Sequence, residues 1–111
     1  MKLRLDKPWT ALTAENVARL PGQLGVYQIA DADGIIVHIG YAGGRSRLGL
    51  RSELQSELDA RGAGYGFRVE VNMQYASRYL ELLMLHRADT GALPRDNAAS
   101  PPARLGRLSP R

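Results

Sequence analysis

Two residues on neighbouring predicted strands could handle a proton. Tyr27 and His38 lie in short β-branched segments that are separated by the turn signal Asp31–Gly34, so the sequence predicts a β-hairpin. A four-residue turn pairs Tyr27 with His38, and a tighter turn pairs Tyr27 with Gly40. In either register Tyr27 and His38 share a face, because the side-chain period of a strand is two. A phenol beside an imidazole could move a proton or hold a water, although such a pair is more often an ordinary packing pair.

A lone carboxylate stands in an apolar helix. Glu81 is the only charged residue in the run Tyr79–Leu85. A helix that is apolar on nearly every side is expected to be largely buried, where an unpaired carboxylate is costly. Arg78, one turn earlier, could supply an ion pair, and a magnesium ion held partly by waters is an equal alternative.

Arginine dominates the basic residues, since it accounts for 13 of the 15 Lys and Arg residues in a chain of net charge +4. Arg45, Arg47 and Arg51 come close together with no acidic residue among them. Arg47 and Arg51 are predicted to share a helix face, where both guanidinium groups could meet one phosphate. A polyanionic partner fits this pattern, and a solvated helix face together with a compositional bias is the plain alternative.

The apolar periodicity predicts the helices and strands that must position these side chains. Together with the length of 111 residues, they predict a single α+β domain. They are a short helix over Ala14–Arg19 capped by Thr13, strands over Gly25–Ala30 and Ile35–Gly40, a helix from Arg47 to Leu58, a strand over Phe67–Val71, and a helix through Tyr79–Leu85. The chain has no cysteine, which excludes disulfides and thiolate zinc sites. No apolar run is long enough to cross a bilayer, so we expect a cytoplasmic protein without membrane contact.

Five features in this order resemble the GIY-YIG nuclease superfamily, which includes the catalytic domains of excision-repair nucleases and homing endonucleases. They are Gly25–Tyr27, His38–Gly40, the arginine-rich helix start, Glu81, and the ending Pro94–Asn97. The resemblance implies a small three-stranded antiparallel sheet flanked by helices over residues 21–97. Residues 1–20 then form an N-terminal extension with a short helix, and residues 98–111, which include Arg104, Arg107 and Arg111, a flexible basic tail.

The resemblance also implies a role for each matching residue. Tyr27 would activate or orient the attacking water, and His38 stands in the place of the superfamily's second tyrosine. Glu81 would bind a single magnesium or manganese ion. The phosphate-neutralising arginine would be Arg51 or, with a different loop alignment, Arg47. Asn97 would close the site.

The expected function is therefore that of a metal-dependent endonuclease acting on DNA, of the repair, recombination or mobile-element type, with branched and single-stranded DNA among its substrates. Tyr41 stands where some repair nucleases have a lysine, and together with Arg45, Arg47 and Arg51 it is predicted to contact nucleic acid. The alternative is a catalytically inactive module of the same fold that binds nucleic acid or a protein partner. The departures at His38 and Tyr41 motivate this alternative.

Overall fold

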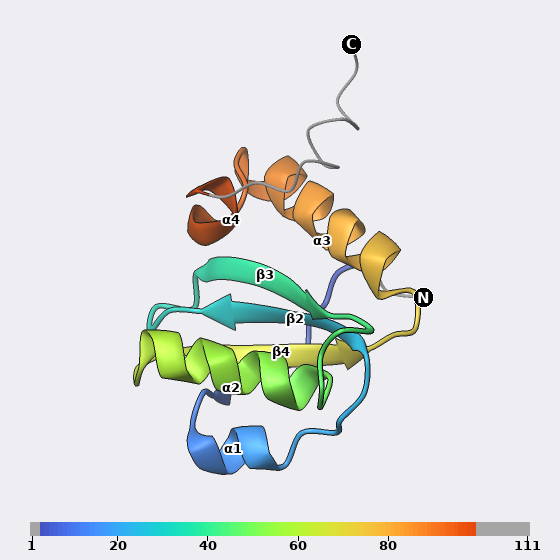
Figure 1. Cartoon of the computed structure of the whole chain (residues 1–111). Coiled ribbons are helices and arrows are strands. Elements are labelled where there is room, and N and C mark those ends of the chain that lie inside the picture. The colour runs from blue at the N-terminus through green and yellow to red at the C-terminus, as the bar shows by residue number, and fades with distance from the viewer. Residues whose placement is uncertain (1–2, 100–111) are drawn as a thin grey trace.

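The computed structural model describes residues 3–99, and Figure 1 shows its arrangement of helices around one sheet. In chain order the elements are β1 (Thr10–Ala11), α1 (Ala14–Ala18), β2 (Gly25–Ala30), β3 (Ile36–Ala42), α2 (Leu50–Arg61), β4 (Gly66–Val71), α3 (Tyr75–Thr90) and α4 (Arg95–Ala99). The predicted α+β class and the predicted hairpin are confirmed.

The sheet is antiparallel and has four strands in the order β1-β4-β2-β3, where the resemblance implied three. The additional strand, β1, consists of Thr10 and Ala11, which pair with Phe67 and Gly66 of β4. Two residues are too few to show an alternating pattern, which is why the sequence did not reveal this strand. In the hairpin, Tyr27 pairs with Gly40, as the tighter of the two predicted registers requires.

Helices cover both faces of the sheet, and each face has its own apolar core. On one face, α1 and α2 pack against the strands, and in Figure 1 they lie below the sheet. The buried side chains of this first core include Val17, Ile29, Leu50, Leu54 and Phe67. On the other face α3 packs against β2 and β3, and the second core contains Leu5, Val26, Ile39, Leu82 and Leu83. The helix α4 lies beside the edge strand β3.

The start of α2 corrects one prediction, because the helix begins at Leu50 and not at Arg47. Gly49 precedes it with φ of +55°, and a Cβ at this position would lie 2.3 Å from the carbonyl oxygen of Gln23. Glycine is therefore required where the chain enters the helix. Arg47 lies outside the helix, so Arg47 and Arg51 do not share a helix face as predicted.

The two ends of the described chain are packed onto the sheet. Thr13 caps α1 as predicted, accepting a hydrogen bond from the backbone N–H of Asn16 at 3.1 Å. Leu5 is buried in the second core.

The helix α4 was not predicted and runs to Ala99, past the predicted domain boundary at residue 97. The basic tail from residue 100 onward lies outside the described residues. None of the helices in residues 3–99 combines the length and the apolar composition that a membrane span needs.

Candidate functional site

Tyr27 and His38 meet on the face of the hairpin that α2 covers. Their ring centroids are 5.9 Å apart, and the rings are tilted by 45°. The Tyr27 side chain lies across Gly40, where a Cβ would approach its phenol oxygen to 2.4 Å. In the same register His38 pairs with Ile29, and the register shifts only beyond this pair, where Ala30 pairs with Ile36. The shared face predicted from the strand period is therefore confirmed, and Gly40 is the residue that makes room for it.

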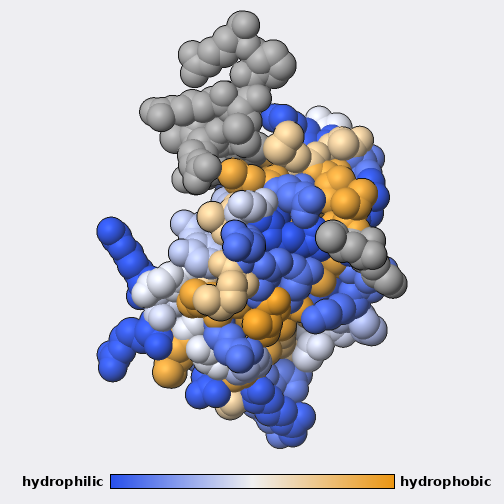
Figure 2. All heavy atoms as spheres, turned by 90° about the vertical axis from the view of Figure 1, so that its right-hand side faces the viewer, coloured by the Kyte–Doolittle hydropathy of each residue, from blue (hydrophilic) through white to orange (hydrophobic). Residues whose placement is uncertain are grey.

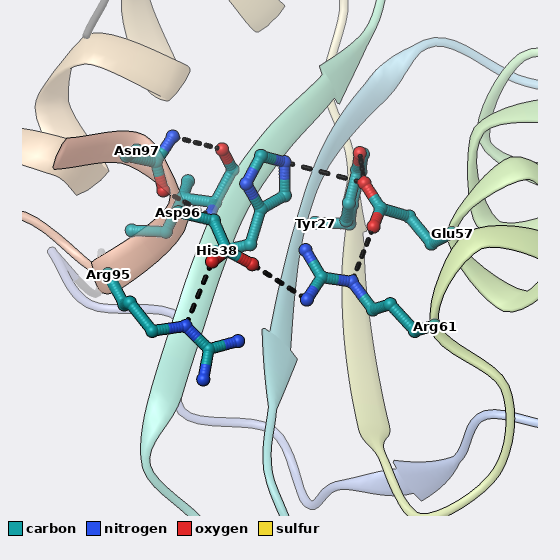
Figure 3. Close-up of polar contacts among 8 residues, drawn as sticks. Tyr27, His38, Glu57, Arg61, Arg95, Asp96 and Asn97 are labelled. Atoms are coloured by element: carbon teal, nitrogen blue, oxygen red, sulfur yellow. Dashed lines mark hydrogen bonds and ion pairs between the residues drawn. The ribbon is translucent and has the colours of Figure 1, made fainter. Parts of the chain in front are cut away.

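A carboxylate from α2 joins the two rings, as Figure 3 shows. The Tyr27 phenol donates a hydrogen bond of 2.6 Å to Oε2 of Glu57. The same oxygen lies 3.4 Å from Nε2 of His38. Arg61, one turn further along α2, donates from Nε to Oε1 of Glu57 at 2.7 Å. Glu57 thus contacts all three side chains at once.

The helix α4 closes this cluster from the side of the edge strand. Arg61 also pairs with Asp96 at 2.7 Å, and Arg95 pairs with the other oxygen of Asp96 at 2.9 Å. The Asn97 side chain accepts a hydrogen bond from the backbone N–H of Ile39 at 2.8 Å and donates one to its carbonyl oxygen at 2.9 Å (Figure 3). Asn97 therefore satisfies two backbone groups of an edge strand, which would otherwise be buried without partners.

Glu81 lies away from this cluster, on the opposite face of the sheet. Its side chain is 46% exposed, which corrects the expectation that it is largely buried. Of the two alternatives for Glu81, the ion pair with Arg78 is present, at 2.5 Å, and Arg78 also pairs with Glu70 at 2.9 Å. These three residues line a cavity of about 590 Å³ between the N-terminal segment, the end of β4 and the start of α3.

The four residues predicted to contact nucleic acid, which are Tyr41, Arg45, Arg47 and Arg51, have different surroundings in the structure. Arg51 donates from Nε to the carbonyl oxygen of Leu20 at 2.9 Å, so it ties α2 to the segment that follows α1. Arg45 and Arg47 are exposed in the loop before α2, and neither pairs with a carboxylate within residues 3–99. Tyr41 is 46% exposed at the end of β3, on the α3 face.

Residues 1–89 match the protein family described as a domain of unknown function (DUF7508). The chain belongs to this family. No curated protein and no solved structure matches the chain. The part that matches the DUF7508 family holds Tyr27, His38, Glu57, Arg61 and Glu81, whereas Asp96 and Asn97 follow it.

Burial determines the proton states of Tyr27 and His38 in this DUF7508 domain. Tyr27 is 3% exposed, and its burial and the nearby Glu57 carboxylate raise the pKa of its phenol far above the ordinary value, so the phenol keeps its proton. Burial lowers the pKa of His38 below its usual 6.5, an effect that the charge of Glu57 opposes. A neutral His38 therefore carries its proton on Nε2, the nitrogen that faces Glu57. Nδ1 is then an acceptor, and it is buried without a hydrogen-bond partner within the described chain.

Sequence reasoning missed Glu57, Arg61 and Asp96. Glu57 and Arg61 are four residues apart in α2, and this spacing was the available signal. The same spacing occurs on many solvated helix faces, so it does not by itself distinguish a site. Asp96 belongs to a five-residue helix that has no apolar pattern of its own.

Proposed function

We propose that this chain is a nuclease domain of the GIY-YIG type that hydrolyses phosphodiester bonds in DNA, with the reaction at the hairpin cluster. One observation carries the proposal. Tyr27 and His38, the two motif residues that the resemblance singles out, lie on one face and share the Glu57 carboxylate. Perturbed titratable groups that meet in this way are common at active sites.

In this proposal His38 accepts the proton of the attacking water, and Tyr27 does not. The Tyr27 phenol donates to Glu57, and its raised pKa opposes formation of a phenolate. His38 is neutral near pH 7, and its side chain is 23% exposed. Glu57 orients the imidazole through Nε2 and leaves the lone pair of Nδ1 to act as the base. Nδ1 is buried and points to the side of Asp96 and Asn97 (Figure 3), so the proposal requires α4 to move aside before water can reach it.

The predicted metal ligand does not fit a metal centre that includes Tyr27 and His38. Glu81 is on the other face of the sheet, and its carboxylate is held by Arg78. Within residues 3–99, no three His, Cys, Asp or Glu side chains are grouped closely enough to hold a metal ion. The proposed reaction therefore includes no step through magnesium or manganese, and the assay tests the metal dependence directly.

The test is incubation of the purified protein with labelled plasmid and branched DNA in magnesium, manganese or chelator, followed by product analysis. His38→Gln is expected to lower the cleavage rate by about 10²- to 10⁴-fold, the usual contribution of a general base. His86→Gln changes the only other histidine in the chain and should cleave like the wild type.

Equal cleavage by the two histidine variants would remove His38 from the chemistry. Glu81→Gln is expected to retain cleavage, with Glu15→Gln, an exposed and ion-paired glutamate, as its control. Loss of cleavage in Glu81→Gln alone, at matched folding, would instead support the metal-binding role implied by the resemblance.

A second candidate function is a catalytically inactive module that binds nucleic acid. Its support is that every carboxylate of the cluster already contacts an arginine and that the Tyr27 phenol is buried. The exposed Arg45 and Arg47 provide the electrostatic part of such binding. Salt-sensitive DNA binding without product in any metal would favour this module over the nuclease.

A further inference from the structure

A cluster of three tyrosine rings lies where β3 ends and α3 begins. Tyr41 stacks on Tyr75 with ring centroids 5.6 Å apart and planes 18° from parallel. Tyr79 meets Tyr41 edge-on, with the centroids 4.9 Å apart. Tyr75 and Tyr79 are half-buried and also pack against the second core, so they hold Tyr41 in place. Tyr41, with 46% of its surface exposed, is the ring of the three most open to solvent.

A basic loop borders this cluster. A Cβ on Gly43 would lie 2.9 Å from the Tyr75 ring, so the loop backbone packs against the aromatic cluster. The loop is held by a hydrogen bond from the backbone N–H of Ser46 to the carbonyl oxygen of Gly43 at 3.0 Å. Arg45 and Arg47 project from it, and residues 41–50 contain no Asp or Glu.

The acidic side chain that contacts this loop does not neutralise the arginines. Glu53 accepts a hydrogen bond of 2.6 Å from the Ser46 hydroxyl. Neither Arg45 nor Arg47 forms an ion pair in the described part of the chain. Figure 2 looks onto the side of the molecule where β3 ends and α3 begins, and hydrophilic residues surround smaller apolar areas there.

We propose that this surface, formed by Tyr41, Arg45 and Arg47, binds single-stranded nucleic acid by stacking an unpaired base on Tyr41. Proteins that bind single strands combine aromatic rings for the bases with cations for the phosphates, and this surface supplies both. A base within a duplex is stacked on its neighbours and cannot lie on the Tyr41 ring, so the surface favours unpaired segments. The inference rests on the proposed function only in taking nucleic acid as the partner.

The position of this surface relates it to the hairpin cluster. Tyr41 and His38 are three residues apart on the edge strand β3, about 10 Å along the strand. They lie on opposite faces, and β3 is the outer strand of the sheet. A nucleic-acid strand anchored at Tyr41 would therefore have to round the edge of β3, beside α4 and Asn97, on its way to His38.

The experiment measures binding of a fluorescein-labelled oligothymidylate and of a duplex of equal length by anisotropy, in chelator, so that no cleavage is needed. Tyr41→Ala is expected to weaken single-strand binding at least about fivefold, the lower end of what stacking one base contributes. Tyr41→Phe keeps the ring and should bind like the wild type. Met73→Ala, which changes a residue that is 75% exposed, is the control for loss of exposed apolar surface.

The two arginines are tested through the salt dependence of the same binding. Arg45→Gln combined with Arg47→Gln should lower the slope of log Kd against log salt by about 1.4, because each phosphate contact to a single strand contributes about 0.7. Arg19→Gln removes an exposed arginine at the C-terminal cap of α1 and should leave the slope unchanged.

The results separate this inference from the nuclease proposal. Duplex bound as tightly as the single strand, or equal loss in Tyr41→Ala and Tyr41→Phe, would overturn the stacking surface even if cleavage is observed. Tyr41-dependent single-strand binding by a protein that cuts no DNA would uphold the surface and reject the nuclease. A melting temperature within the wild-type range is required of each variant, and the comparison of single strand with duplex on the wild-type protein keeps the test decisive if Tyr41→Ala folds poorly.

Discussion

Arg61 and Arg78 each hold two carboxylates, and they do so on opposite faces of one sheet. Arg61 pairs with Glu57 and Asp96, both at 2.7 Å. Arg78 pairs with Glu70 at 2.9 Å and with Glu81 at 2.5 Å. Both guanidinium groups are largely buried, with 13% and 9% of their side chains exposed. By charge alone the two clusters are nearly equivalent.

Their remaining contacts separate them. The Arg61 cluster includes Tyr27 and His38, two groups whose pKa values burial shifts in opposite directions. The Arg78 cluster has no such group, and Arg78 instead donates to the carbonyl oxygen of Leu3, which anchors the N-terminal segment. An arginine that holds two carboxylates is therefore not a sign of function in itself. The buried Tyr27 and His38 rings are what make the Arg61 cluster the candidate site.

The largest expected effect on stability comes from breaking the Arg78 cluster. Arg78→Met should lower the free energy of unfolding by about 3–5 kcal/mol, the usual result of leaving a buried charge without its partner. Glu70 would then keep a half-buried carboxylate whose pKa the arginine now lowers. Urea denaturation measures the change.

Arg4→Met is the matched control for this variant, because Arg4 forms a two-point ion pair with Asp89 at the surface. It should change stability little. An equal loss of unfolding free energy in the two variants would mean that the buried Arg78 ion pairs stabilise the fold no more than the surface pair of Arg4.

A smaller effect is expected at the centre of the hairpin cluster. Glu57→Gln should cost about 1–3 kcal/mol, because an amide cannot accept from both Tyr27 and Arg61 as the carboxylate does. It should also lower the pKa of His38 further, since the charge of Glu57 raises that pKa in the wild type. NMR titration of His38 measures this shift, and Asp59→Asn, at an exposed position of the same helix, is the control. A rise in the His38 pKa would contradict the geometry.

The hairpin could be predicted from the sequence, because a strand period of two fixes which side chains share a face in any register. The carboxylates of the cluster could not be predicted, because Glu57 and Asp96 come from helices far along the chain and only the tertiary packing brings them close to the hairpin. Glu81 was misjudged because an apolar composition was read as burial. Met84, one turn later on the same helix, is exposed as well.

The pH dependence of stability sharpens the assignment of His38. Burial lowers the pKa of His38 in the folded state, so the unfolded chain takes up a proton more readily. Its contribution to stability is then fully present above about pH 6.5 and is lost as the pH falls through the lowered folded value. His38→Gln should flatten the stability profile between about pH 7 and pH 5, measured by urea midpoints. His86 has a lowered pKa too, so some slope should remain. An unchanged profile in His38→Gln would show that the imidazole is not held neutral.

The smallest effect on stability is expected at Glu81. This variant tests whether the Arg78 cluster has only a structural role. Glu81→Gln should change the free energy of unfolding by less than about 1 kcal/mol, because the Glu81 carboxylate is well exposed and screened by solvent. The new amide oxygen can still accept from Arg78, which also keeps both bonds to Glu70. Because the fold should be nearly unchanged, a loss of cleavage in Glu81→Gln could not be attributed to misfolding. Cleavage retained would leave the Arg78 cluster a structural one. Cleavage lost at wild-type stability would place Glu81 in the chemistry, and the face of the sheet that now looks structural would be the one that acts.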